Sequence, residues 1–346
     1  MNPFIWALLI TSLSTGTIIT MISHHWLLAW IGLELNTLSI LPVIMKTHHP
    51  RATEAATKYF ITQTTAAALI LFASTMNAWQ TGHWSITSSP PQQTATIMTI
   101  ALMLKLGVAP VHLWYPEVLQ GATMNVALTI TTWQKIAPMT LLMLLHNHLP
   151  TMLLMLTGLI STLIGGFTGL NQTQTRKIMA FSSIAHMGWL MMTLPLSPHL
   201  TTLTLITYII MSIATFTTLS TMTMKTITDT NTAWTNSPTL LTLTMLSLMS
   251  LGGLPPLTGF MPKLLILNNL VMNALTPLGT AVALASLPSL FFYIRLAYLT
   301  MLTNPPNNTN TKYCWRFKSH PQQTTTTPLI LTLLLLPMTP LLYLTT

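Results

Sequence analysis

The sequence predicts an all-α, polytopic membrane protein with about eleven transmembrane helices. Only 13 Lys and Arg and 4 Asp and Glu occur among 346 residues, so 5% of the chain is charged. An ordinary soluble domain has about 25% charged residues, and a chain this poor in charge cannot cover a water-facing surface. Because 51% of the residues are hydrophobic, disorder is excluded as well. The abundant threonine is compatible with a membrane helix, since its hydroxyl can bond to the helix's own carbonyls.

A transmembrane helix needs about 20 mostly apolar residues, and polar, proline and glycine positions divide the chain into segments of that size. The predicted spans are 3–22, 25–45, 55–78, 93–115, 122–145, 151–171, 176–195, 199–223, 238–271, 275–299 and 325–344. The connecting loops are short, and we therefore expect one membrane domain over 1–346. The segment MNPFIWALLI is apolar from the start and lacks the features of a cleaved targeting peptide, so the first helix is expected to act as its own insertion signal.

The positive charges predict the orientation of these spans. Ten of the 13 basic residues lie at alternate loops or span ends, namely Lys46, Arg51, Lys58, Arg176, Lys177, Lys225, Arg295, Lys312, Arg316 and Lys318. The opposite loops contain none, which is the positive-inside pattern and places the N-terminus inside and the C-terminus outside. No stretch holds the five or more clustered basic residues of a nucleic-acid-binding patch, so we expect no nucleic-acid partner.

Four charged residues fall within predicted spans: Glu34, Lys105, Lys135 and Lys263. Each lysine near a helix centre costs roughly 2.5–3.5 kcal/mol on the insertion scale. One glutamate cannot pair with three lysines, and the lysines lie too deep in their spans to snorkel. A structural ion pair between helices is the alternative, but this set favours a buried path for protons or ions.

Two of these lysines lie beside sequences that interrupt a helix. Lys105 is followed by Gly107 and Pro110, and LGGLPPLTGFMPKLLIL places several glycines and prolines just before Lys263. Proline removes a backbone donor and clashes with the preceding turn, so we expect two discontinuous helices. The breaks lie five spans apart, and an odd number of spans inverts the second copy, which predicts two inverted five-helix repeats. The expected segments are a first repeat over 3–145, a second over 151–299, an inside loop over 300–323 and a C-terminal helix over 325–344.

Cysteine and histidine give weaker signals. The single cysteine, Cys314, excludes a disulfide scaffold and thiolate metal or iron–sulfur sites within the chain. No set of facing mid-helix histidines suggests haem ligation. His112 and His186 lie inside or near spans and are candidates for auxiliary proton relay, with a packing role as the alternative.

Five segments together carry a family resemblance that runs in order from Met1 to the last span. They are HWLLAWIGLELNTLSILPV, KLGVAPVHLWYPEVLQG, TWQKIAP, GLNQTQTRKIMAFSSIAHMGW and LGGLPPLTGFMPKLLIL. They resemble the subunit 2 family of mitochondrial NADH:ubiquinone oxidoreductase, respiratory complex I, which is a family of antiporter-like membrane subunits. Most antiporter-like subunits carry fourteen spans, and the eleven predicted here look like the shortened animal form that lacks three N-terminal helices.

The resemblance implies roles for individual residues. Glu34 matches the family's glutamate, Lys105 its partner lysine on the first broken helix, and Lys135 the central lysine of the next helix. Lys263 matches the charged residue at the second broken helix, while His112 and His186 match positions discussed as relay groups. A Glu34–Lys105 contact at about 4 Å would contribute roughly 4 kcal/mol at an effective dielectric constant near 20. Separating the pair would then let Lys105 release its proton toward Lys135 and Lys263.

The resemblance also implies the setting. The function expected is proton translocation coupled to electron transfer from NADH to ubiquinone, with NADH, FMN, iron–sulfur clusters and ubiquinone bound by other subunits and no cofactor bound by this chain. The expected partners are neighbouring membrane-arm subunits and lipids such as cardiolipin. The expected location is the mitochondrial inner membrane, with the N-terminus on the matrix side and the C-terminus on the intermembrane-space side. A stand-alone cation/proton antiporter and a purely structural subunit of the membrane arm are the alternatives.

Overall fold

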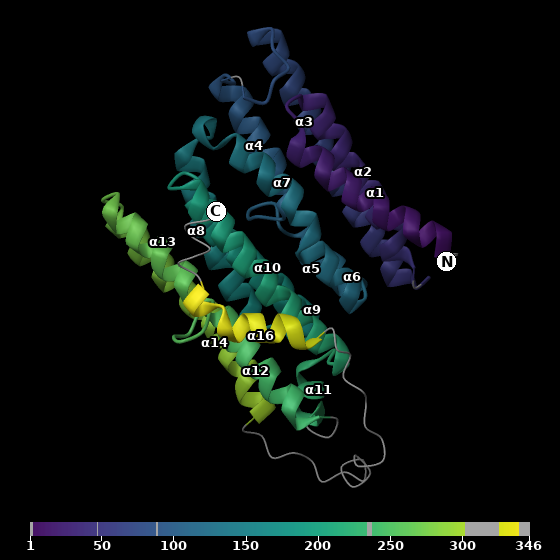
Figure 1. Ribbon diagram of the computed structural model, residues 1–346, viewed down its shortest axis with the longest axis vertical. Coiled ribbons are helices and arrows are strands. Elements are labelled where there is room, and N and C mark those ends of the chain that lie inside the picture. Colours follow the sequence, from purple (N-terminus) through teal and green to yellow (C-terminus); the bar gives the residue numbers. More distant parts are fainter. Residues whose placement is uncertain (1–2, 47, 88, 234–236, 302–324, 339–346) are drawn as a thin grey trace. The chain divides into compact units, whose positions relative to one another are not determined.

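The computed structural model describes residues 3–46, 48–87, 89–233, 237–301 and 325–338, and every regular element in these ranges is a helix. The chain divides into two compact units, Met1–Ser161 and Thr162–Thr346, which are described separately (Figure 1). The expected inside loop over 300–323, with Lys312, Cys314, Arg316 and Lys318, lies almost entirely outside the described residues.

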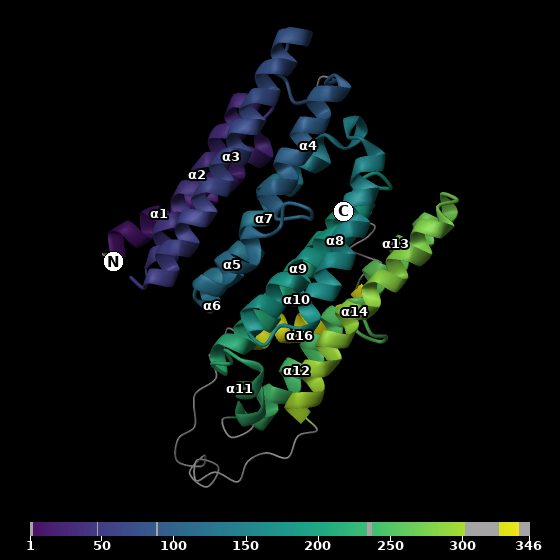
Figure 2. The ribbon, with the colours of Figure 1, turned by 180° about the vertical axis from the view of Figure 1, so that it is seen from behind.

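The first unit consists of helices that run along one another. Its elements are α1 (Pro3–Ile22), α2 (Trp26–Met45), α3 (Pro50–Thr81), α4 (Gln92–Leu106), α5 (Trp114–Gly121), α6 (Met124–Thr131), α7 (Trp133–Leu144), the short 3-10 helix η1 (His146–His148) and the first part of α8 (Thr151–Leu170). Helix α2 packs between α1 and α3, and α3 also packs against α4 and α5 (Figures 1 and 2).

Small residues let α1 and α2 approach closely. A Cβ atom on Gly16 would lie 3.0 Å from the Gly32 carbonyl oxygen, and one on Gly32 would lie 2.9 Å from the Gly16 carbonyl oxygen. The two backbones therefore touch at this crossing, as is common where membrane helices associate without a hydrophobic driving force between them. This crossing fixes α2, which carries Glu34, against its neighbour.

The second unit contains the rest of α8 together with α9 (Thr175–Thr193), α10 (Pro198–Thr221), α11 (Ile227–Thr232), α12 (Pro238–Gly252), α13 (Phe260–Met272), α14 (Thr276–Met301), α16 (Thr326–Leu334) and η4 (Leu336–Met338). The C-terminal helix α16 packs across α10 and α12 (Figures 1 and 2). The Arg295 guanidinium donates to the carbonyls of Leu170, at the end of α8, and of Gln172. A cation at this helix C-terminus satisfies carbonyls that have no partner within the helix.

The two predicted helix breaks are confirmed. Helices α4 and α5 are separated by residues 107–113, and α12 and α13 by residues 253–259. Six described helices are long and apolar enough to cross a membrane, with α12 and α13 as shorter apolar helices. The full count of eleven spans and the inverted relation of the repeats remain predictions.

The structure contains a third helix interruption that was not predicted from the sequence. The predicted span over 122–145 is divided at Thr132 into α6 and α7. The hydroxyls of Thr131 and Thr132 both donate to the Leu128 carbonyl, at 2.9 and 2.8 Å, and such back-bonding bends helices. Pro138, further along, has no N–H to donate to the Gln134 carbonyl. Regular hydrogen bonding therefore fails just before Lys135.

Threonine hydroxyls bond within their own helices, as the composition predicts. Thr17 and Thr20 of α1 donate to the carbonyls of Ser14 and Thr17, at 2.8 and 2.7 Å. The same pattern recurs along α10, for example from Thr204 to Thr201 at 3.0 Å. Polar side chains that bond in this way add little cost in an apolar environment.

Candidate functional site

The first helix break places Lys105 at the end of α4. The helix stops at Gly107, whose φ of +69° lies in the left-handed region that glycine adopts without steric cost. The Val108 N–H donates to the Met103 carbonyl at 3.1 Å, which closes the helix end with the bond typical of a glycine-capped C-terminus. Lys105 therefore lies in the last turn of α4, and only 7% of it is exposed.

Glu34 lies near Lys105 without contacting it. The Glu34 carboxylate accepts a hydrogen bond from the Thr37 hydroxyl at 3.0 Å, and it interacts electrostatically with Lys105. No ion pair within 4.0 Å joins the two residues, and the Lys105 ammonium has no hydrogen-bond partner among the described residues. The direct contact expected between Glu34 and Lys105 is thus not formed in this structure.

Lys135 is buried in the first turn of α7, with 3% of it exposed. Its ammonium lies 5.0 Å from the centre of the Tyr115 ring, which belongs to α5. Lys105 and Lys135 line the same cavity of about 20 Å³, together with the polar side chains Asn36, Thr37, Tyr59, Gln63, Tyr115 and Gln134. The first unit therefore brings two buried lysines to one small polar cavity.

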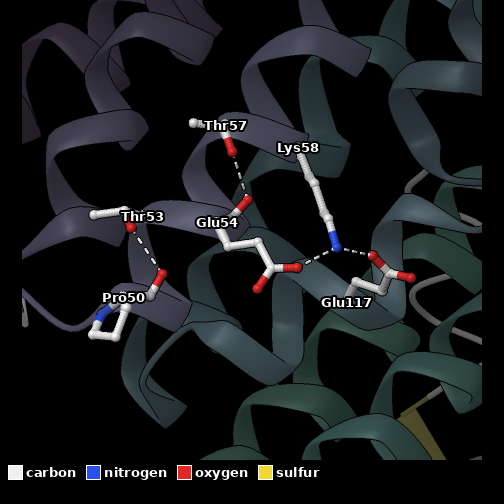
Figure 3. Close-up of polar contacts among 6 residues, drawn as sticks. All are labelled: Pro50, Thr53, Glu54, Thr57, Lys58 and Glu117. Carbon is white, nitrogen blue, oxygen red and sulfur yellow. Dashed lines mark hydrogen bonds and ion pairs between the residues drawn. The ribbon is translucent and has the colours of Figure 1, made fainter.

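Helix α5 is fixed to α3 along one face. The Trp114 and Tyr59 rings meet edge to face with centroids 5.8 Å apart. At the exposed side, the Lys58 ammonium bridges Glu54 of its own helix and Glu117 of α5, at 2.5 Å from each carboxylate (Figure 3). These contacts hold the helix whose Tyr115 faces Lys135.

The second helix break repeats the geometry of the first. Helix α12 ends at Gly252 and is capped by Gly253, which has a φ of +77°. The Leu254 N–H donates to the Met249 carbonyl at 3.4 Å. A cis X–Pro peptide bond follows within each break, at Ala109–Pro110 and at Pro255–Pro256. Both breaks thus use a glycine-capped helix end followed by proline.

Lys263 lies on the other side of its break, in the first turn of α13. Its ammonium donates to the carbonyl of Gly252, the last residue of α12, at 2.8 Å, and lies 5.9 Å from the centre of the Trp189 ring. It lines a cavity of about 20 Å³ together with His186, Trp189, Thr204, Thr207, Tyr208 and Met211.

The two candidate histidines differ in their surroundings. His112 is buried in the first break, and its Nδ1 lies 3.2 Å from the Pro110 carbonyl oxygen, within the same break. His186 lines the cavity of the second unit and packs 5.5 Å from the Tyr208 ring, measured between centroids. His186 lines a cavity together with Lys263, whereas His112 is not among the residues that line the cavity of Lys105 and Lys135.

The structure thus groups Glu34, Lys105 and Lys135 in the first unit, and Lys263 with His186 in the second. The aromatic residues beside the lysines, Tyr115 and Trp189, were not predicted from the sequence. Their only sequence signal is position, because each lies within one of the segments that carry the family resemblance. Among the described residues, no group of three or more His, Cys, Asp or Glu could hold a metal ion.

The sequence matches known protein families over nearly its whole length. Residues 23–288 match the family described as "NADH:quinone oxidoreductase/Mrp antiporter, TM", and residues 290–343 match "NADH dehydrogenase subunit 2 C-terminus". The chain is 53% identical to NADH-ubiquinone oxidoreductase chain 2 of Carassius auratus, over 98% of each chain. It is 50% identical to that of Squalus acanthias, over 100% of each.

Two solved structures share the fold. The chain matches one in respiratory complex I from Thermus thermophilus with bound aureothin at a TM-score of 0.86 and 23% identity, over 98% of this chain and 79% of the other. It matches one in the Mrp complex from Dietzia sp. at a TM-score of 0.84 and 16% identity, over 97% of this chain and 76% of the other. On these sequence matches, the chain belongs to the NADH:quinone oxidoreductase/Mrp antiporter family of membrane proteins and, within it, to the NADH-ubiquinone oxidoreductase chain 2 family.

Proposed function

We propose that this protein is a proton-translocating membrane subunit of respiratory complex I, and that Glu34, Lys105, Lys135 and Lys263 form its proton relay. The observation that carries the proposal is the placement of the two buried lysines, Lys105 and Lys135, and of the partly buried Lys263 beside interrupted helices. Buried ionisable residues in a membrane protein are expensive and mark ion or proton pathways. Each lysine also lines a small cavity that contains further polar groups.

The helix ends give the three lysines different electrostatic surroundings. Lys105 lies in the last turn of α4, where the negative end of the helix dipole favours a positive charge. Lys135 and Lys263 lie in the first turns of α7 and α13, where the positive helix end opposes one. Lys105 is therefore suited to hold a proton, and Lys135 and Lys263 are suited to pass one on.

The cavities allow proton transfer through water. A cavity of about 20 Å³ can hold one water molecule, because such a site needs at least about 10–15 Å³ and two or more polar partners. In the first unit Gln63, Gln134 and the lysines provide these partners. In the second unit His186 and the hydroxyls of Thr204 and Thr207 do so beside Lys263. His186 is thus the better candidate for an auxiliary relay, and we assign His112 no direct transfer step.

Glu34 would control the first step. When its carboxylate approaches Lys105, the charged form of the lysine is stabilised, and when it withdraws the lysine loses a partner that no other described acid replaces. In this proposal, an arrangement in which Glu34 and Lys105 are separated, as in this structure, would favour proton release. Redox energy from another subunit would drive the pair between the two arrangements.

The remaining parts of the proposal follow from family membership. The chain would work beside other complex I membrane subunits, with lipids such as cardiolipin at its surface, in the mitochondrial inner membrane. The N-terminus would face the matrix and the C-terminus the intermembrane space. NADH, FMN, iron–sulfur clusters and ubiquinone would be bound by other subunits.

A stand-alone cation/proton antiporter is not favoured, because the sequence relatives at about half identity over nearly the whole chain are NADH-ubiquinone oxidoreductase chain 2. The purely structural alternative is tested by Lys135→Met in the intact complex. We expect retained assembly and fewer protons translocated per electron. Lys225→Met, which removes an exposed lysine outside the cavities, is the matched control and should change neither quantity. Normal proton stoichiometry in assembled Lys135→Met complex would contradict the proposed role.

A further inference from the structure

Lys263 has no carboxylate beside it in the part of its unit that the structure describes. The sequence contains four acidic residues, and only Asp229 belongs to the second unit. The Asp229 carboxylate accepts hydrogen bonds from the backbone N–H groups of Lys225 and Thr226 at the start of α11. Lys263 takes part in no ion pair within 4.0 Å among the described residues. An ammonium group removed from water needs some other partner.

That partner is the end of α12. The last carbonyls of a helix accept no hydrogen bond from within the helix, and together they carry about half a negative charge. The Lys263 ammonium donates to the carbonyl of Gly252, the final residue of α12, at 2.8 Å. Hydrogen bonds from a charged donor are among the stronger ones in proteins.

The other half of the broken helix acts with the opposite sign. Lys263 belongs to the first turn of α13, whose positive end opposes its charge. The same cation is thus stabilised by the negative end of α12 and opposed by the positive end of α13. The Trp189 ring, at 5.9 Å, adds a weaker attraction on the cavity side.

Gly253 makes the close approach possible. A Cβ atom at this position would lie 2.9 Å from both Cδ and Nζ of Lys263 and 3.0 Å from Cε. A side chain here would occupy the space through which the lysine reaches the Gly252 carbonyl. Because the colliding atoms belong to the end of a flexible side chain, the lysine would move and the helix would stay.

We infer that the C-terminus of α12 serves Lys263 in place of a carboxylate, and that Gly253 is the positioning residue for this contact. The inference rests on the proposed function in assigning Lys263 to the relay. In the first unit a movable acid, Glu34, accompanies Lys105. In the second unit the carbonyl end of a helix does so, and motion at the break between α12 and α13 would hold or release Lys263.

The test compares two glycine substitutions in the intact complex. Gly253→Ala adds a Cβ atom at a φ of +77°, and Gly82→Ala adds one at a φ of +76°, at the end of α3, where no atom lies within 4 Å. Both variants place a Cβ atom on a residue of nearly the same positive φ, but only Gly253→Ala meets a lysine. Lys263→Ala and the double variant Gly253→Ala/Lys263→Ala complete the set.

Three quantities are measured: assembled complex, protons per electron, and the position of Lys263 in a structure of the Gly253→Ala complex. We expect Gly82→Ala to pump normally. Gly253→Ala should pump like Lys263→Ala, and its lysine should leave the Gly252 carbonyl, with the occupancy of the contact falling about ten-fold or more. The double variant should pump like Lys263→Ala alone, since the glycine acts through the lysine.

The other possible results decide for or against the positioning role of Gly253. An unchanged Lys263–Gly252 contact in the Gly253→Ala structure overturns the positioning role. If Gly253→Ala fails to assemble, recovery in the double variant supports the inference, and continued failure overturns it. Unchanged stoichiometry in Lys263→Ala would remove Lys263 from the relay, and the structure of Gly253→Ala would still decide the positioning role.

Discussion

The electrostatic coupling of Glu34 and Lys105 makes the most direct prediction. The two groups interact across a separation greater than 4.0 Å. For separations of about 4–8 Å and an effective dielectric constant near 20, the Coulomb energy is about 2–4 kcal/mol. A free energy of this size changes the occupancy of a proton site by about 30- to 1,000-fold. Removing either group should therefore disable the step that both control.

The assay uses three variants of the intact complex: Lys105→Met, Glu34→Gln and the double variant. Each single change should lower the number of protons translocated per electron while the complex assembles. Lys105→Met leaves Glu34 without the lysine on which it acts, so the step that needs both groups is already lost in the single variant. The double variant should therefore lose little more than either single variant, as expected for two residues of one network.

A purely structural ion pair predicts different results. The single variants would lower the amount of assembled complex, the double variant would partly restore it, and the complex that forms would pump normally. Native electrophoresis gives the amount of complex, and simultaneous proton-uptake and NADH-oxidation measurements give the stoichiometry. Full stoichiometry in assembled Lys105→Met complex would refute the role assigned to this lysine.

Three further predictions concern single contacts. Tyr115→Leu should lower proton translocation because it removes the ring that faces Lys135, a contact worth up to about 2 kcal/mol when desolvated. Tyr115→Phe keeps the ring and should pump normally. Equal rates of proton translocation in the two variants would contradict a role for the ring. Glu117→Gln should speed amide hydrogen exchange in α5, whereas Glu54→Gln, which removes the partner on Lys58's own helix, should not (Figure 3). Burial works to raise the pKa of Asp229, but hydrogen bonds from backbone N–H groups offset this and hold the pKa below its ordinary value of 3.8. The stabilising effect of the carboxylate is thus fully present at neutral pH and declines as the pH falls below 3.8. Asp229→Ala should speed amide exchange in α11 at pH 7, and the difference from the unchanged protein should shrink as the pH is lowered below 3.8, with a pH-independent difference as the contrary result.

The sequence was sufficient for the features that depend on local chemistry. Gly107 and Gly253 adopt the left-handed region where helices must end, and the prolines beyond them prevent the helices from resuming at once. The candidate relay lysines are identifiable because charge is so rare in this chain. Both signals lie in a few adjacent residues and need no knowledge of the tertiary fold.

Other features depend on distant parts of the chain and were not predictable. The interruption at Thr132 coincides with two threonine hydroxyls that bond to the same carbonyl, an arrangement that the amino-acid composition does not determine. Tyr115 faces Lys135 only because α5 packs against α3. The separation of Glu34 from Lys105 depends on how α2 and α4 lie within the unit. The sequence indicates that the two charges belong together but does not indicate how far apart they are.

The position of each lysine relative to its helix break connects sequence to mechanism. Lys105 precedes Gly107 by two residues and therefore ends a helix, where the backbone favours its charge. Lys263 follows Gly259 by four residues and therefore begins a helix, where its own backbone opposes its charge. Lys135 begins a helix as well, because the chain is interrupted at Thr132. A lysine that its own helix opposes depends on contacts from other elements, and these include the Tyr115 ring for Lys135 and the α12 carbonyl end for Lys263. In the proposed relay, motion of those elements would change how readily each of these lysines holds its proton, whereas Lys105 would respond to the position of the Glu34 carboxylate.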